Sequence, residues 1–222
     1  MNRISRKVGQ RGRGIVLAML TLSALAGCQS AYYGAMEQFG FHKRDIMVDR
    51  VEEAAESQQE AKEQFEDAFE QFASVVSVPP SELRSTYDRL SRSFEGAESK
   101  AGEVSERIDA VESVSEALFD EWREEIEIIG NDELRRSSIR QLERSEDRYE
   151  NLMAAMRRAE ERMEPVLDTF RDYVLYLKHN LNAQAVASLE GELTGVETDV
   201  SVLIRDMEAA ISEARAFIDS ME

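Results

Sequence analysis

The sequence contains few of the residues that carry most enzyme chemistry. Its 222 residues include one cysteine, Cys28, and two histidines, His42 and His179. Groups that exchange protons near neutral pH are therefore scarce. The motifs of serine-hydrolase elbows, HExxH zinc sites, ExxH di-iron sites and nucleotide-binding P-loops are missing as well. Acidic runs such as Glu124-Glu125 are typical of solvated helix faces and lack the spacing of an EF-hand. We therefore expect no enzymatic activity, no metal site and no cofactor.

Acidic residues are absent from the first 27 positions, where five basic residues precede an apolar run from Ile15 to Leu25. This layout is typical of an export signal. An apolar helix of about 11 residues is roughly 16 Å long, whereas the hydrocarbon core of a bilayer is roughly 30 Å thick. We predict that residues 1–27 are a cleaved signal peptide and not a permanent membrane span.

The residues Leu25-Ala26-Gly27-Cys28 resemble the lipobox of bacterial lipoprotein precursors. The resemblance implies cleavage before Cys28, a diacylglyceryl group on its sulfur and acylation of the new amino terminus. Two or three acyl chains anchor a protein almost permanently, whereas one binds only marginally. Gln29 is not the aspartate that retains enterobacterial lipoproteins in the inner membrane, so we expect the periplasmic face of the outer membrane. The alternative is an ordinary buried cysteine at the end of an apolar helix.

Basic residues are outnumbered in the mature chain. All 45 acidic residues follow Cys28, whereas five of the 27 basic residues precede it, which leaves a formal charge of −23. Such a chain repels nucleic-acid phosphates and anionic lipids, so we expect no nucleic-acid partner. The segment from Tyr32 to Arg44 combines aromatic and basic side chains that suit membrane headgroups. The alternative is that residues 28–43 are a plain tether.

Proline is also rare, with three in the chain, and apolar residues after Arg44 recur at alternating steps of three and four. This spacing predicts long helices that pack along a coiled-coil seam. The first seam ends before Pro79-Pro80, and Ser81 is the expected N-cap of the second helix. The seam positions are Val51, Ala54, Gln58, Ala61, Phe65, Ala68, Phe72 and Val75, then Leu83, Tyr87, Leu90, Phe94, Ala97, Ala101, Val104, Ile108, Val111, Ser115, Leu118, Trp122, Glu125 and Ile129.

Gly130-Asn131-Asp132 predicts the end of the second helix and the start of the third, and so short a connection requires the two to be antiparallel. The third seam comprises Leu142, Ser145, Tyr149, Leu152, Met156, Ala159, Met163, Val166, Phe170, Tyr173 and Leu177. After Leu177 the apolar steps lengthen to four, which is a stutter. Thr194 and Glu197 have the spacing of a capping box, so we expect a fourth helix to begin at Thr194. A bent continuation of the third helix is the alternative.

These features predict an all-α fold, an elongated antiparallel coiled-coil-like bundle of three to four long helices over residues 44–222. The expected helices are 44–78, 82–129, 132–188 and 194–221. Because the directions alternate, we expect the Gly130 turn at the end where the first helix begins. Residues 177–184 should lie near Pro79-Pro80.

A polar cluster lies in the third helix, where Lys178, His179, Asn180 and Asn182 follow a seam that is otherwise apolar. One hypothesis is a binding patch for peptidoglycan, another glycan or a protein. The alternative is a set of structural contacts that satisfy the Pro79-Pro80 turn and fix the register of the bundle, as a buried asparagine can do in coiled coils.

Three stretches of the mature chain resemble the bacterial lipoproteins grouped as domain of unknown function 2959. They read YYGAMEQFGFHKRDIMVDRVEEA, FEGAESKAGEVSERIDAVESVSEALFDEW and LYLKHNLNAQAVASLEGEL. The resemblance covers nearly all of the mature protein and implies neither an activity nor site residues.

Two functional hypotheses follow. The first is a non-enzymatic envelope lipoprotein that acts as a periplasmic scaffold, spacer or docking surface, with a protein partner or a second copy of itself. The second is a binding module that recognises peptidoglycan, or a protein partner of an envelope enzyme, through residues 178–184.

Overall fold

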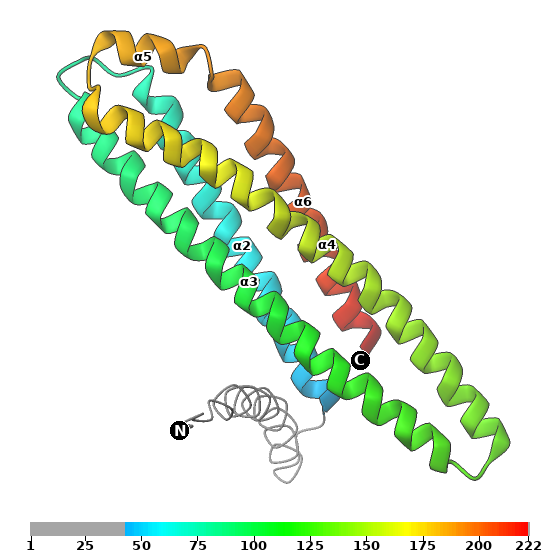
Figure 1. The fold of residues 1–222 in the computed structure, drawn as a ribbon. Coiled ribbons are helices and arrows are strands. Elements are labelled where there is room, and N and C mark those ends of the chain that lie inside the picture. Colours follow the sequence, from blue (N-terminus) through cyan, green and yellow to red (C-terminus); the bar gives the residue numbers. More distant parts are fainter. Residues whose placement is uncertain (1–42, 222) are drawn as a thin grey trace, which may run out of the picture. The chain divides into compact units, whose positions relative to one another are not determined.

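The computed structural model describes residues 43–221, and every regular element in that part of the chain is a helix. The elements are α2 (Lys43–Val75), α3 (Leu83–Ile128), α4 (Asp132–His179), α5 (Ala183–Glu190) and α6 (Leu193–Met221). The four long helices form a bundle, and the short α5 joins α4 to α6 across one end (Figure 1). The predicted all-α bundle is therefore confirmed.

Neighbouring helices of the bundle run in opposite directions. Lys100 of α3 donates to Glu60 of α2 at 2.8 Å, and Arg107 of α3 donates to Glu53 of α2 at 2.8 Å. A step of seven residues forward along α3 thus matches seven residues backward along α2. The α2–α3 connection and α5 lie at one end of the bundle, and the α3–α4 turn lies at the other (Figure 1). The alternating directions agree with the sequence-based expectation.

The predicted seam forms the core of the bundle. All eight seam positions of α2 are buried, including the polar Gln58. The Phe72 ring of α2 stacks on the Tyr173 ring of α4 with 4.8 Å between centroids, and it lies 6.3 Å from the Phe170 ring. Aromatic pairs of this kind add about 0.5–1.5 kcal/mol to the burial of their area. The heptad spacing therefore identifies the inward face correctly.

The seam loses its burial near the α3–α4 turn. Trp122 is half-buried and Glu125 is exposed, while Ile126 is buried instead. The register of the α2–α3 ion pairs places Ile46 of α2 at the level of Val114. Beyond that level α3 and α4 continue together, past the ends of α2 and α6 (Figure 1). We call this part, residues 118–148, the distal hairpin.

The first connection of the bundle differs from the prediction. The helix α2 ends at Val75 and not at residue 78, because the Ser77 N–H bonds to the Ser74 carbonyl at 3.1 Å in a tight turn. Ser81 is not an N-cap. The helix α3 begins at Leu83, and Glu82 occupies the cap position without a side-chain hydrogen bond.

The predicted third helix of 132–188 divides into two. Asn180 ends α4, since its N–H bonds to the Leu177 carbonyl at 3.1 Å. Asn182 begins α5 as its N-cap. Asparagine side chains that bond to nearby backbone compete with a continuous helix, which explains the break.

The start of the last helix also differs. The helix α6 begins at Leu193, and the Glu192 carbonyl accepts the N–H of Val196 at 3.1 Å. Thr194 therefore lies inside the helix, where its backbone carbonyl accepts a hydrogen bond from the Thr198 hydroxyl at 2.8 Å. The predicted capping box at Thr194 is wrong.

Candidate functional site

The structure describes one of the two predicted sites, the polar patch, and not the other, the lipidation site. Cys28, the predicted lipidation site, lies outside the described residues, and so does the segment from Tyr32 to His42. Lys43 and Arg44 form the first turn of α2. Among residues 43–221, no helix combines the length and the apolar character needed to cross a bilayer.

The predicted patch of Lys178, His179, Asn180 and Asn182 lies where α4 gives way to α5. The Asn180 amide donates to the Tyr176 carbonyl at 2.8 Å. The Asn182 side-chain oxygen accepts two backbone N–H groups of α5, each at 3.0 Å. Both asparagines therefore serve the ends of their own helices. Lys178 and His179 are exposed and remain the outward-facing members of the patch.

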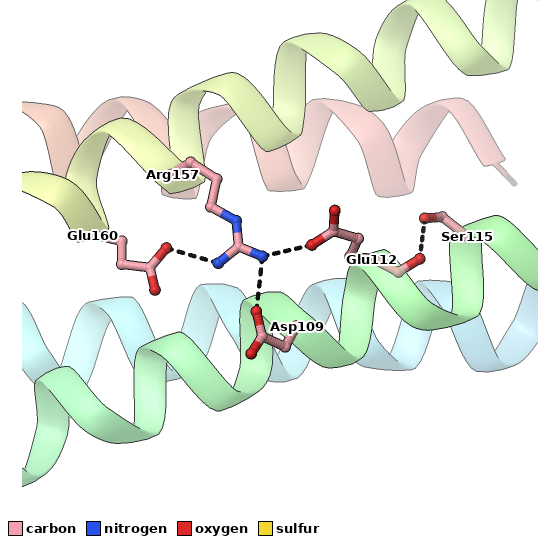
Figure 2. Close-up of polar contacts among 5 residues, drawn as sticks. All are labelled: Asp109, Glu112, Ser115, Arg157 and Glu160. Carbon is pink, nitrogen blue, oxygen red and sulfur yellow. Dashed lines mark hydrogen bonds and ion pairs between the residues drawn. The ribbon is translucent and has the colours of Figure 1, made fainter. Parts of the chain in front are cut away.

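An ion cluster around Arg157 joins α3 and α4. Its guanidinium donates to Asp109 at 2.7 Å and to Glu112 at 2.6 Å, both on α3, and to Glu160 of α4 at 2.9 Å. Figure 2 shows the guanidinium between the two helices, with a carboxylate on each side. Burial lowers the pKa of Arg157, but the hydrogen bonds to the three carboxylates outweigh it and leave the pKa above the ordinary value. The cluster fixes the register of α3 against α4.

A groove of about 620 Å³, which we call the distal groove, separates α3 from α4 on the side of the cluster nearer the turn. Six carboxylates and one guanidinium line it, which gives a formal charge of −5. Its lining residues are Ser115, Glu116, Phe119, Asp120, Arg123, Glu143, Glu146, Asp147, Tyr149 and Glu150. The Phe119 and Tyr149 rings meet edge to face at its floor, with 5.5 Å between centroids. Burial raises the pKa of the Tyr149 hydroxyl, so the tyrosine is neutral at physiological pH.

A smaller hollow of about 390 Å³ lies on the other side of the Arg157 cluster. The small side chains of Ala101 and Ser105 and the glycine Gly102 open it between the helices. Arg171 compensates its charge, since the guanidinium bonds to Glu98 of α3 at 3.0 Å and to Asp168 of α4. This hollow has a formal charge of −2, from three carboxylates and one guanidinium, and is less acidic than the distal groove with its −5.

Carboxylates are the main titratable groups of both hollows. No histidine or cysteine lines them. Within residues 43–221, no three or more His, Cys, Asp or Glu side chains are grouped closely enough to hold a metal ion. What the distal groove can do is attract a cation and bury an apolar contact. Sequence reasoning missed it, although the spacing of Asp109, Glu112 and Glu116 beside the seam was a signal of a shared acidic face.

The comparison with protein families gives a match over most of the chain. The model of the family described as protein of unknown function (DUF2959) matches residues 32–221. The chain belongs to this family. The DUF2959 match covers every helix of the bundle and confirms the family that the sequence resembles. The chain matches no curated protein.

Proposed function

We propose that this DUF2959 protein is a non-enzymatic envelope lipoprotein, anchored through lipid on Cys28, that works as a periplasmic scaffold or docking surface. The observation that carries the proposal is the order of the chain. An export signal and the sequence Leu25-Ala26-Gly27-Cys28 come directly before a bundle of long helices. A lipid at one end and protein-binding surfaces along the helices are what a scaffold needs.

Two features of the bundle support this role. Its helices are long, with 46 residues in α3 and 48 in α4, which corresponds to roughly 70 Å at ~1.5 Å per residue. The surface also carries many cross-helix ion pairs, such as Arg162 with Asp206 at 2.5 Å and Lys62 with Glu208 at 2.8 Å. Long paired helices present extended faces to a partner, whereas enzymes enclose a reaction site.

The test is metabolic labelling with a palmitate analogue, followed by separation of inner and outer membranes, for the native chain and for Cys28→Ala. We expect label and outer-membrane flotation in the native protein and the loss of both in the variant. Cys28→Ser is the matched control, because it keeps the polarity and size of the side chain but cannot form the thioether. A native protein that carries no label and remains in the soluble fraction would contradict the proposal.

A second candidate function is a binding module at the junction of α4 and α5. The observation that favours it is exposure. Leu175 and Tyr176 are 54% and 40% exposed, beside the exposed Lys178 and His179. Apolar side chains on the surface next to polar ones are a usual feature of ligand and partner sites. Peptidoglycan or a protein partner of an envelope enzyme is the proposed ligand.

This candidate is tested by retention on purified cell-wall sacculi. The variant Lys178→Ala/His179→Ala removes the outward-facing side chains and leaves both helix caps in place. We expect it to lose retention, whereas Arg205→Ala/Arg215→Ala, on α6, should retain the native level. Equal retention of all three proteins, or none by the native protein, would eliminate wall binding.

A further inference from the structure

The distal hairpin carries apolar surface that no other described helix covers. Ile128 is 84% exposed and Leu134 is 62% exposed, next to the α3–α4 turn. Ile139 is 38% exposed and lies four and seven residues before Glu143 and Glu146, so it shares their face of α4. Ile139 therefore continues the distal groove toward the turn, whereas Ile128 and Leu134 lie on other faces of their helices.

Four of the six carboxylates of the distal groove lack a cation. Glu116, Glu143, Asp147 and Glu150 form no ion pair with any residue that the structure describes. The carboxylates around the Arg157 cluster, by contrast, share one guanidinium at 2.6–2.9 Å. Like charges that face one another across a groove repel, and a bound cation removes that repulsion.

One cation already lies in the groove and shows what fits there. Arg123 donates to Asp120 of its own helix at 2.7 Å and to Glu146 of the opposite helix. A guanidinium thus spans the space between α3 and α4. Additional cations placed one helical turn away from it would meet the four unpaired carboxylates.

We propose that the distal groove is a docking site for a cationic amphipathic helix of a partner protein. Basic residues spaced three or four apart would pair with the carboxylates on both walls, and the apolar face would cover Ile139 and the Tyr149 ring. A second copy of this chain does not suit the site, because the mature chain has a formal charge of −23. The inference deepens the proposed docking role by naming the surface and the chemistry of its partner.

The test uses the full-length protein in neutral detergent micelles and a labelled helical peptide of about 18 residues. The peptide is rich in alanine, so that it does not partition into micelles, and carries lysine along one face. A control peptide of the same length and charge, with proline in place of a central alanine, cannot form the continuous helix. Binding is followed by fluorescence anisotropy at several salt concentrations. Emission of Trp122, the one tryptophan of the chain, is a second readout, since its indole N–H donates to the Ser138 hydroxyl of α4 at 2.8 Å and so responds to changes between the two helices.

Two variants of equal charge change separate the groove from general attraction to an acidic protein. Glu116→Gln/Glu143→Gln/Asp147→Asn/Glu150→Gln neutralises the groove. Glu190→Gln/Glu197→Gln/Asp199→Asn/Glu213→Gln neutralises exposed positions on α5 and α6. We expect the dissociation constant to rise at least tenfold in the first variant and less than twofold in the second.

A third variant should strengthen peptide binding instead of weakening it. Arg123→Gln frees two carboxylates and should tighten peptide binding several-fold, with a matching change in Trp122 emission. Equal losses in both charge variants, equal binding of the proline peptide, or weaker binding by Arg123→Gln would overturn the proposal. None of these readouts requires the lipid anchor, so failure here is distinguishable from failure of the lipidation test.

Discussion

The four-helix part of the bundle and the distal hairpin share the helices α3 and α4, yet they bury their residues very differently. In the four-helix part Leu90 and Leu203 are completely buried. In the hairpin Ile128 and Leu134 point into solvent, although Leu142 is buried. In a four-helix bundle several neighbouring helices cover the apolar face of each helix. In a pair of helices the single partner covers only a narrow stripe of that face. The number of neighbours, and not the sequence pattern of one helix, therefore sets how much of a seam is buried.

The pairing of charges also differs between the four-helix part and the distal hairpin. Arg157 and Arg171 bridge α3 and α4 within the four-helix part, and each pairs with a carboxylate on both helices. In the hairpin Arg123 is the bridging cation, and four carboxylates of the groove stay unpaired. Exposed ion pairs contribute only about 0–1 kcal/mol each, so the difference concerns the specificity of binding more than stability.

The largest expected difference is in the cost of removing a core leucine. Leu90→Ala should destabilise the protein by about 3–5 kcal/mol, because the side chain is completely buried among several helices and leaves a cavity. Leu142→Ala in the hairpin should cost about 2 kcal/mol or less, since two helices can close around the gap. Chemical denaturation of both variants measures this. Equal losses of stability in the two variants would show that the hairpin is packed as firmly as the four-helix part.

Hydrogen exchange should resolve the two regions without mutation. Amides of the distal hairpin should open with free energies at least ~2 kcal/mol below those of the four-helix part, because fewer buried contacts hold them. Exchange measured by mass spectrometry on peptides covering residues 118–148, against peptides covering residues 86–108, makes the comparison within α3 and α4. Uniform protection along α3 would contradict it.

Gln58 tests whether the four-helix part has a weak layer of its own. Its amide is completely buried, and neither the nitrogen nor the oxygen has a hydrogen-bond partner in the structure. Gln58→Met keeps the length of the side chain and should stabilise the protein by about 1–2 kcal/mol, by removing the buried polar groups. Gln59→Met, at a half-buried position, is the control and should change the stability by less than about 0.5 kcal/mol. Destabilisation by Gln58→Met would mean that water satisfies the amide.

The smallest expected effect concerns the turn of the hairpin. The Asn131 side chain accepts the N–H groups of Glu133 at 2.9 Å and of Leu134 at 3.0 Å. Asn131→Ala should cost about 1 kcal/mol through the lost cap. Asn151→Ala, inside α4, is the control. It should change the stability by only a few tenths of 1 kcal/mol, because alanine itself favours the helix. Thermal melts of the two variants measure this difference. Equal melting temperatures for Asn131→Ala and Asn151→Ala would show that the cap does not stabilise the protein.

Much of the fold was predictable because it depends on local spacing. The seam of α2, from Val51 to Val75, is buried at all eight positions, and the Asn131 cap lies where the sequence places it. The helix ends near Ser81 and Thr194 were wrong, because each of these side chains has capping chemistry but the backbone around it was already helical or tightly turned. Asn180 and Asn182 were recognised as unusual, and their helix-ending role became evident only from the bonds they make.

The candidate groove could not be predicted in the same way. Glu116 and Glu150 are 34 residues apart in the sequence and face one groove only because α3 and α4 fold back on each other.

The sequence by itself determined the export signal pattern, the acidic charge and the inward face of each helix, because these depend on residue type and on a period of 3.5. Tertiary structure alone decided where α2 ends relative to α3, which carboxylates find a guanidinium, and which part of the seam is left without neighbours. Those properties depend on the relative lengths and register of helices that meet in space, and no single helix carries that information.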